Sequence, residues 1–321
     1  MINSIKQRIP LSLKKPVKHA ACSIVNACKL LIPRGKPDFF IIGAVRSGTT
    51  SLFNYLNIHP QLESARIKEP SYYGYNFNKG RSWYLTQFPP RRRFGKDTLF
   101  FEASPIYLHD PKAAQRMYGD FPNAKIVVLL RDPIERAVSH YSFCSDPESI
   151  FVKTHAKNNP GLLESRTIEE AFYSELKGQG ERNIHKYCAL GLYARQLQRF
   201  MRYYPIEQFH FIETGELRDE TLQDTLKSLF LFLGVDEKIA HRQQYKPVVE
   251  EVNDESAFKK NDRGLMARYN VMKYDIELEE PLMTELKRFF KEDVALLQQI
   301  TGRPCSWAEN YLRGGPAGEK D

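Results

Sequence analysis

A loop near residue 43 has the composition of a binding site for an anionic group. It follows an apolar run and reads Gly43-Ala-Val-Arg-Ser-Gly-Thr-Thr50. Glycines allow a tight turn, and the free N–H groups at the start of a following helix attract an anionic oxygen. A nucleotide triphosphatase loop would carry lysine at position 49, where this chain has threonine. We therefore predict an anion site that lacks the lysine clamp for a triphosphate, formed by Arg46, Ser47, Gly48, Thr49 and Thr50.

A second candidate site follows the apolar run KIVVLL at 125–130, which predicts a buried strand. Arg131 comes directly after this run, and Ser139 lies two helical turns further on. Ligands bind at the carboxyl ends of the strands in open α/β sheets. An arginine with a hydroxyl at such a position suits a phosphate monoester. The alternative is that Arg131 caps the edge of the sheet and that Asp132-Pro133 only begins a helix.

Together, the two motifs resemble those of the sulfotransferases that use 3′-phosphoadenosine 5′-phosphosulfate (PAPS). In that family the first loop binds the 5′-phosphosulfate, and the motif R-D-P-x-x-R-x-x-S, which begins here at Arg131, binds the 3′-phosphate. The resemblance covers roughly residues 38–235 and extends to the heparan sulfate (glycosaminoglycan) branch. The segments that resemble this branch are KEPSYY at 68–73, WYLTQFP at 83–89, FEASPIY at 101–107, GLY at 191–193 and FLG at 232–234.

The resemblance implies an enzyme that moves a sulfonate group from PAPS to a hydroxyl or an amine of a carbohydrate by in-line transfer. Arg46 and the amides of 47–50 would hold the transferring group and the departing phosphate, while Arg131 and Ser139 would hold the 3′-phosphate. Because such a transition state is loose, positioning and charge stabilisation would dominate the catalysis.

A general base must take the proton of the acceptor, and Glu69 matches the position of a catalytic glutamate in the family. The alternative for Glu69 is a salt bridge with Lys68 or Arg66. Glu102 and then His140 follow as candidates. Histidines and carboxylates show no metal-ligand spacing, so we expect no metal requirement.

Two departures from the family leave positions open. Ala103 stands where the family has a lysine in E-K-[ST]-P, and the late K-G-R segment has no clear counterpart. On the acceptor side we expect Lys68, Trp83 and Arg91, although Trp83 could instead be a core aromatic and Arg91 part of a solvated basic run. Basic residues that could replace the late segment are Lys259, Lys260, Arg263, Arg268 and Lys273.

Other functions stay open at this point. A P-loop nucleotide kinase or NTPase would need the missing lysine and magnesium. A sulfotransferase could act on a lipid or a small-molecule alcohol instead of a glycan. A non-catalytic module could bind nucleic acid or a membrane through its basic residues.

The elements that must position these residues alternate between strand-like and helix-like patterns. This alternation predicts an α/β fold, P-loop-like, with a mostly parallel sheet flanked by helices on both faces. We expect a basic tail at 1–37, a single domain at 38–312 and a flexible end at 313–321. The expected strands are 39–43, 98–101, 125–130 and 208–213, and the expected helices are 49–58, 112–118, 133–143, 167–177, 184–204, 221–233 and 281–300.

The charge of the 321-residue chain is unevenly distributed. Its formal net charge is +8, and residues 1–36 hold eight basic side chains and no acidic one. A basic tail on a neutral body weakens a nucleic-acid interpretation and suits peripheral contact with an anionic membrane. The early apolar run is shorter than the roughly 20 residues that a spanning helix needs. The five scattered cysteines indicate free thiols, so we expect a cytoplasmic enzyme, by preference bacterial, without a transmembrane anchor.

Overall fold

The computed structural model describes residues 33–149, 151–156, 159–179, 185–241, 259–260, 266–267 and 276–312. Most of the basic tail, the end at 313–321 and three late basic candidates (Arg263, Arg268 and Lys273) lie outside the described residues. Lys259 and Lys260 are described only as backbone, in a two-residue strand.

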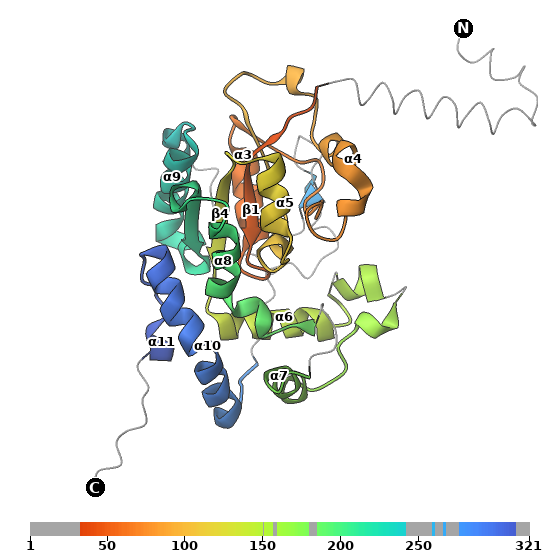
Figure 1. Ribbon diagram of the computed structural model, residues 1–321, viewed down its shortest axis with the longest axis vertical. Helices are drawn as coiled ribbons and strands as arrows, with labels where there is room; N and C mark the ends of the chain where they lie inside the picture. Colours follow the sequence, from red (N-terminus) through yellow and green to blue (C-terminus); the bar gives the residue numbers. More distant parts are fainter. Residues whose placement is uncertain are drawn as a thin grey trace, which may run out of the picture.

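A five-stranded sheet with the order β2-β3-β1-β4-β5 forms the centre of the molecule (Figure 1). All four neighbouring strand pairs are parallel. The strands are β1 (Pro37–Gly43), β2 (Leu62–Ser64), β3 (Leu99–Ala103), β4 (Lys125–Leu130) and β5 (Phe209–Glu213); a separate antiparallel pair comprises β6 (Lys259–Lys260) and β7 (Met266–Ala267).

Helices lie between successive strands of the five-stranded sheet along the chain, and the last helices come after the final strand. The α-helices are α3 (Thr49–Ile58), α4 (Gly80–Thr86), α5 (Ala113–Asp120), α6 (Pro133–Ser145), α7 (Ile168–Leu176), α8 (Tyr193–Met201), α9 (Leu222–Leu233), α10 (Glu280–Thr301) and α11 (Glu309–Leu312). The shorter helical turns are η1 (Phe77–Lys79), η2 (Arg91–Arg93), η3 (Pro105–Leu108), η4 (Val152–Ala156), η5 (Pro160–Leu162), η7 (Ala189–Gly191), η8 (Ile206–Gln208), η9 (Thr214–Leu217), η10 (Asp219–Thr221) and η11 (Glu237–His241).

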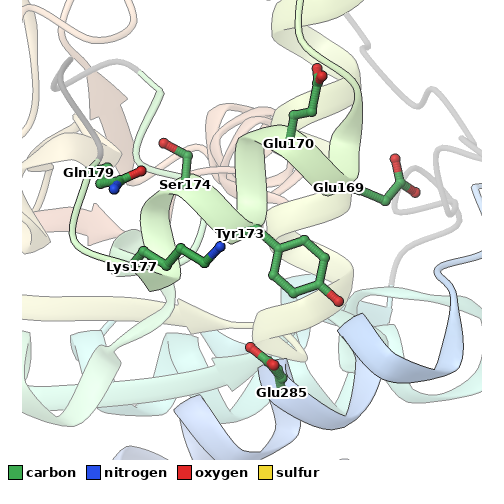
Figure 2. A pocket seen from close by; sticks show the side chains of 7 residues that line it. All are labelled: Glu169, Glu170, Tyr173, Ser174, Lys177, Gln179 and Glu285. Carbon is green, nitrogen blue, oxygen red and sulfur yellow. The ribbon is translucent and has the colours of Figure 1, made fainter.

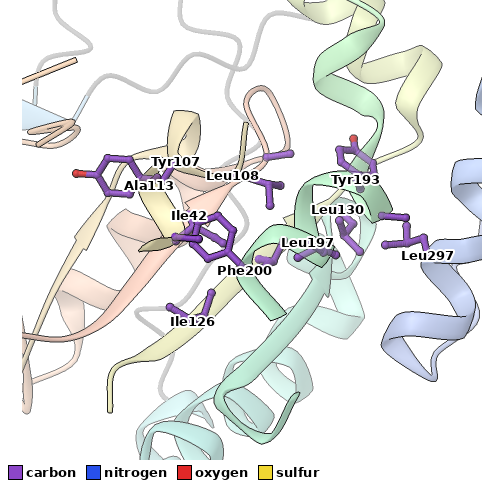
Figure 3. Close-up of a cluster of buried hydrophobic side chains, with 14 of the residues drawn as sticks. Ile42, Tyr107, Leu108, Ala113, Ile126, Leu130, Tyr193, Leu197, Phe200 and Leu297 are labelled. Atoms are coloured by element: carbon purple, nitrogen blue, oxygen red, sulfur yellow. The ribbon is translucent and has the colours of Figure 1, made fainter. Parts of the chain in front are cut away.

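Both faces of the sheet are buried, because side chains alternate along each strand. Phe39 and Ile41 of β1 belong to a buried cluster with residues of α3 and α9. Phe40 and Ile42 belong to a second cluster, on the opposite face, with residues of α5, α8 and α10. Figure 3 shows part of this second cluster, where side chains of β1 and β4 meet those of α8 and α10. The expected α/β fold with helices on both faces is confirmed.

The pattern-based helix over 184–204 is wrong in its first half, because α8 begins only at Tyr193. The carboxylate of Glu175 accepts hydrogen bonds from the amides of Cys188 (2.8 Å) and Ala189 (2.7 Å). Gly191 also lies so close to α10 that a Cβ there would be 2.9 Å from Phe290. Tertiary contacts therefore hold this stretch as turns.

Residues 33–36 pack against the body of the molecule, although their charge groups them with the basic tail. The amide of Gly35 donates to the carbonyl of Pro89 (2.9 Å), and Arg34 donates to the carbonyl of Phe88 (3.3 Å). Arg34 also forms a β-bridge with Pro90. In the part of the chain that the structure describes, we find no helix with the length and apolarity to cross a membrane.

Candidate functional site

The candidate residues lie where the parallel strands end. The loop after β1 is fixed to its neighbours by backbone contacts, since the amide of Ala44 donates to the carbonyl of Leu129 (2.7 Å). The hydroxyl of Thr214, which follows β5, shares its one proton between the carbonyls of Ser47 (2.9 Å) and Leu130 (3.1 Å). Three strand ends are thereby held together at one edge of the sheet.

The loop after β1 turns through two residues with left-handed backbone angles. Arg46 has φ 67° and Gly48 has φ 86°. Gly48 is the N-cap of α3, and no side chain of the described residues caps this helix end. The amides of its first turn have no partner within a helix, and the start of a helix is a favourable position for an anionic group. The side chains of Ser47 and Thr49 are buried, and that of Thr50 is half-buried.

Arg46 joins the two anion motifs directly. Its Nε donates to the hydroxyl of Ser139 (3.2 Å), and its guanidinium lies 4.3 Å from the ring centre of Phe143 on α6. Arg131 donates from Nη1 to the carbonyl of Arg46 (3.4 Å) and pairs with Glu135 (3.2 Å). Thus Arg46, Arg131 and Ser139, which are far apart in the sequence, form one basic site with a hydroxyl.

The start of α6 is anchored by groups that the motif alone did not indicate as part of a site. Asp132 caps the helix by accepting from the amides of Ile134 (2.9 Å) and Glu135 (3.0 Å), and Tyr311 donates to the same oxygen (2.7 Å). The hydroxyl of Tyr193 donates to the carbonyl of Arg131 (2.9 Å).

Burial raises the pKa of Tyr193 to about 12, so this phenol remains a donor at neutral pH. The GLY segment at 191–193 was the available sequence signal for Tyr193. Thr214 carried no such signal, because its role depends on the end of β5 lying beside β4.

Glu69 lies at the carboxyl end of β3. Its amide donates to the carbonyl of Ala103 (3.0 Å), and its side chain is 50% exposed. Its carboxylate forms an ion pair with Lys68, so the salt bridge considered as the alternative is present. Because half of the side chain faces solvent, the carboxylate can still meet an acceptor.

The other two base candidates do not reach the surface. Glu102 is fully buried and accepts hydrogen bonds from three hydroxyl groups. His140 is buried with its ring 5.1 Å from that of Tyr187, and burial holds its pKa well below the usual value. Neither side chain can contact an acceptor in this arrangement.

The expected acceptor-side residues lie in different places. Trp83 is half-buried on α4, 4.5 Å from the ammonium group of Lys79 and 6.5 Å from the ring of Tyr72. Arg91 donates to the carbonyls of Thr98 and Lys96 (2.6 Å each), near the start of β3. Arg91 therefore lies at the amino end of the strand whose carboxyl end holds Glu69, and the structure does not bring it to the other candidates.

An open pocket of about 520 Å³ is lined by residues of α7, of the segment that follows it and of α10, and by none of the candidate site residues (Figure 2). Its carboxylates would repel an anionic donor. The residues that line it are Glu169, Glu170, Tyr173, Ser174, Lys177, Gln179 and Glu285. Among the described residues, no group of three or more histidines, cysteines or carboxylates has the geometry of a metal site.

Comparisons with known proteins identify several relatives. The chain is 29% identical over 208 residues to a bifunctional heparan sulfate N-deacetylase/N-sulfotransferase 1 of Caenorhabditis briggsae. This alignment covers 63% of this chain and only 23% of that protein. It is 26% identical over 279 residues to heparan sulfate glucosamine 3-O-sulfotransferase 5 of Homo sapiens, covering 84% of this chain and 74% of that protein.

A solved structure and a family model also match this chain. The crystal structure of a sulfotransferase from Alicyclobacillus acidocaldarius matches with a TM-score of 0.62 and 26% identity, over 86% of this chain and 99% of that chain. The family model for the sulfotransferase domain matches residues 36–298. With its P-loop-like turn lacking lysine and its basic site at the strand ends, the chain belongs to the sulfotransferase domain family.

Proposed function

We propose that this sulfotransferase moves a sulfonate group from PAPS to a hydroxyl or an amine of a carbohydrate acceptor by in-line transfer. The observation that carries the proposal is the hydrogen bond between Arg46 and Ser139, which joins the two predicted anion-binding motifs at one edge of the sheet. Together with the uncapped start of α3, this edge offers donors for two separate anionic groups.

The donors at this edge of the sheet suit a nucleotide that carries two separate anionic groups. Arg46 and the amides of 47–50 would hold the 5′-phosphosulfate and stabilise the charge that develops on the departing phosphate. Arg131 and Ser139 would bind the 3′-phosphate, with the guanidinium held in place by Glu135. Positioned charges of this kind lower the barrier because they need no reorganisation during the reaction.

Glu69 is the proposed base. As a bond forms between the acceptor oxygen or nitrogen and sulfur, the bond between sulfur and the phosphate oxygen breaks, and the carboxylate of Glu69 takes the acceptor's proton. Lys68 contacts this carboxylate and would orient it. Trp83, on the neighbouring α4, offers a half-buried ring against which a sugar could stack.

The carbohydrate acceptor is supported by the likeness to two heparan sulfate sulfotransferases. A labelled-sulfate transfer screen from PAPS tests it, with glycans, lipids and small alcohols as separate arms. Transfer to a glycan alone is expected; transfer to lipids or small alcohols alone would replace the carbohydrate part of the proposal.

Two variants test the residues. Arg46→Ala is expected to lower kcat by about 10²–10³-fold, the usual effect of losing one preorganised contact, and Glu69→Gln should lower kcat with little change in donor KM. Arg202→Ala, on an exposed arginine at the end of α8, is the matched control. Wild-type turnover in Arg46→Ala would remove that residue from the mechanism.

Ligand binding gives a test that does not depend on the acceptor. Adenosine 3′,5′-bisphosphate should raise the melting temperature of the protein, and ATP with Mg²⁺ should not, because the loop lacks the lysine clamp. Stabilisation by ATP·Mg²⁺ alone would favour a nucleotide kinase and contradict the proposal.

We also propose that residues 1–36 contact anionic membranes peripherally, in a cytoplasmic enzyme. The support is their charge, eight basic side chains and no acidic one.

A further inference from the structure

Glu102 is connected through two hydroxyl groups to the segment that carries Glu69. It is the penultimate residue of β3, and its side chain is fully buried. Oε1 accepts from the hydroxyls of Tyr84 (2.9 Å) and Tyr107 (2.9 Å), and Oε2 accepts from the hydroxyl of Ser104 (2.7 Å). A carboxylate that contacts three hydroxyls and no solvent cannot act on an acceptor itself.

Two of these hydroxyls also hold the backbone that follows Glu69. The oxygen of Ser104 accepts from the amide of Ser71 (3.1 Å), and the oxygen of Tyr107 accepts from the amide of Tyr73 (3.3 Å). A hydroxyl has one proton and two lone pairs. Because each proton is given to Glu102, each oxygen is left to accept from an amide of residues 69–73.

This stretch of backbone needs external support. Glu69 (φ 60°) and Ser71 (φ 48°) both adopt left-handed angles, which are unfavourable for residues with a side chain. Such conformations persist only where the surrounding structure imposes them. The contacts from Ser104 and Tyr107, with the bond from the amide of Glu69 to the carbonyl of Ala103, supply that support.

We propose that Glu102 is a positioning residue for the base, whose carboxylate orients the Ser104 and Tyr107 hydroxyls so that they hold residues 69–73 in the conformation that presents Glu69. The inference rests on the proposed function, because it assigns Glu102 a role through Glu69. It also explains why a charged group is kept in a fully buried place, where burial raises its pKa.

Glutamine at position 102 tests the need for a carboxylate. Its NH₂ group would replace one accepting oxygen and donate to a hydroxyl, which removes the acceptor for that hydroxyl's proton. Whichever position the NH₂ group takes, Ser104 or Tyr107 would then lose the acceptor that orients its hydroxyl, and its bond to the backbone would weaken. Ser104→Ala and Tyr107→Phe each remove one relay and leave the carboxylate in place. Tyr84→Phe is the matched control, because the Tyr84 hydroxyl donates to Glu102 and bonds to none of the described amides at 69–73.

The experiment measures amide hydrogen exchange at 69–73 together with steady-state kinetics, in the full chain. In Glu102→Gln, and in the Ser104→Ala/Tyr107→Phe double variant, we expect exchange at Ser71 and Tyr73 to become about tenfold faster or more. We expect kcat to fall by about tenfold or more, because displaced catalytic groups lose rate steeply. Donor KM and affinity for adenosine 3′,5′-bisphosphate should stay within about twofold of wild type, since that site lies on other strands.

Unchanged exchange in Glu102→Gln, or an effect of Tyr84→Phe as large as that of Tyr107→Phe, would overturn the proposal. Parallel losses of kcat and nucleotide affinity would also contradict it, because they indicate a general structural role. If Glu102→Gln does not fold, the two single hydroxyl variants decide. If the wild-type chain transfers no sulfonate to any acceptor, the proposed function fails, and the exchange data still show whether Glu102 holds the segment.

Discussion

At the scale of single residues, Glu102 and Arg46 differ in how far their charged groups are buried. Arg46 is half-buried, contacts Ser139 and is available to a ligand. Glu102 is fully buried, and among the described residues its carboxylate accepts hydrogen bonds from three neutral hydroxyls. A buried carboxylate without a cationic partner lowers stability when it ionises, so the free energy of unfolding should depend on the protonation of this one side chain.

Glu102 should make the free energy of unfolding depend on pH. Burial raises its pKa from 4.5 to about 7, against the opposing effect of the hydrogen bonds from Ser104, Tyr84 and Tyr107 and with a further contribution from the charge of Glu69. Since the folded state holds the proton more tightly, the stabilising contribution is complete below pH 4.5 and is lost as the pH rises to about 7. The difference in unfolding free energy between wild type and Glu102→Gln should fall by up to about 3 kcal/mol over this interval.

Urea unfolding at several pH values between 4.5 and 8 measures this difference. Glu207→Gln, on an exposed side chain of η8, controls for the loss of one surface carboxylate. A difference for Glu102→Gln that rises with pH, or does not change, would show that burial does not raise the pKa of this carboxyl group.

At the scale of elements, patterns predicted the segments whose local signals agree with their tertiary contacts. The helix over 49–58 and the strand over 125–130 were predicted with their observed bounds, because a glycine turn precedes the first and an apolar run forms the second. β2 was missed, since three residues show no periodicity and pair only with β3. The predicted start of the helix over 184–204 was wrong, because Gly191 packs against Phe290. This contact joins positions about a hundred residues apart in the sequence.

The cap of α6 gives a prediction at this scale. Asp132→Ala removes the acceptor for the amides of Ile134 and Glu135 and for the Tyr311 hydroxyl. The change should lower the unfolding free energy by about 1–2 kcal/mol, as loss of an N-cap does. It should also weaken binding of adenosine 3′,5′-bisphosphate, because α6 carries Ser139 and begins beside Arg131.

Asparagine retains the capping oxygen, so Asp132→Asn is the matched control and should stay close to wild type in both measurements. Thermal melts and isothermal titration with the bisphosphate provide the data. Equal losses in Asp132→Ala and Asp132→Asn would show that the charge of Asp132, rather than its cap, supports the site.

At the scale of the whole molecule, parallel topology explains why two sequence motifs become one site. Because β1 and β4 are parallel neighbours, the loop at Arg46 and the arginine at 131 emerge at the same edge. That much could be predicted from the sequence. The relays from Glu102 could not, since Ser104 follows β3, Tyr107 lies on η3 and their partners Ser71 and Tyr73 lie in a connecting segment. Only packing brings these groups together.

The net charge of +8 equals the eight basic side chains of residues 1–36, and the last prediction concerns these residues. Residues 1–32 hold six of the eight basic residues that precede position 37, while Arg34 is bonded to the body. Near an anionic lipid surface each such residue contributes about 1 kcal/mol of attraction, which salt screens. The full chain should therefore bind phosphatidylserine-containing vesicles at low salt and release them at high salt.

A chain that begins at Pro33 keeps the contacts of Arg34 and Gly35, and it should lose vesicle binding yet retain sulfonate transfer to a soluble acceptor. Replacing Lys6, Arg8, Lys14, Lys15, Lys18 and Lys29 by glutamine separates charge from length, and vesicle flotation reads out both variants. Binding that survives in the glutamine variant, or that is equal on phosphatidylcholine alone, would rule out an electrostatic contact.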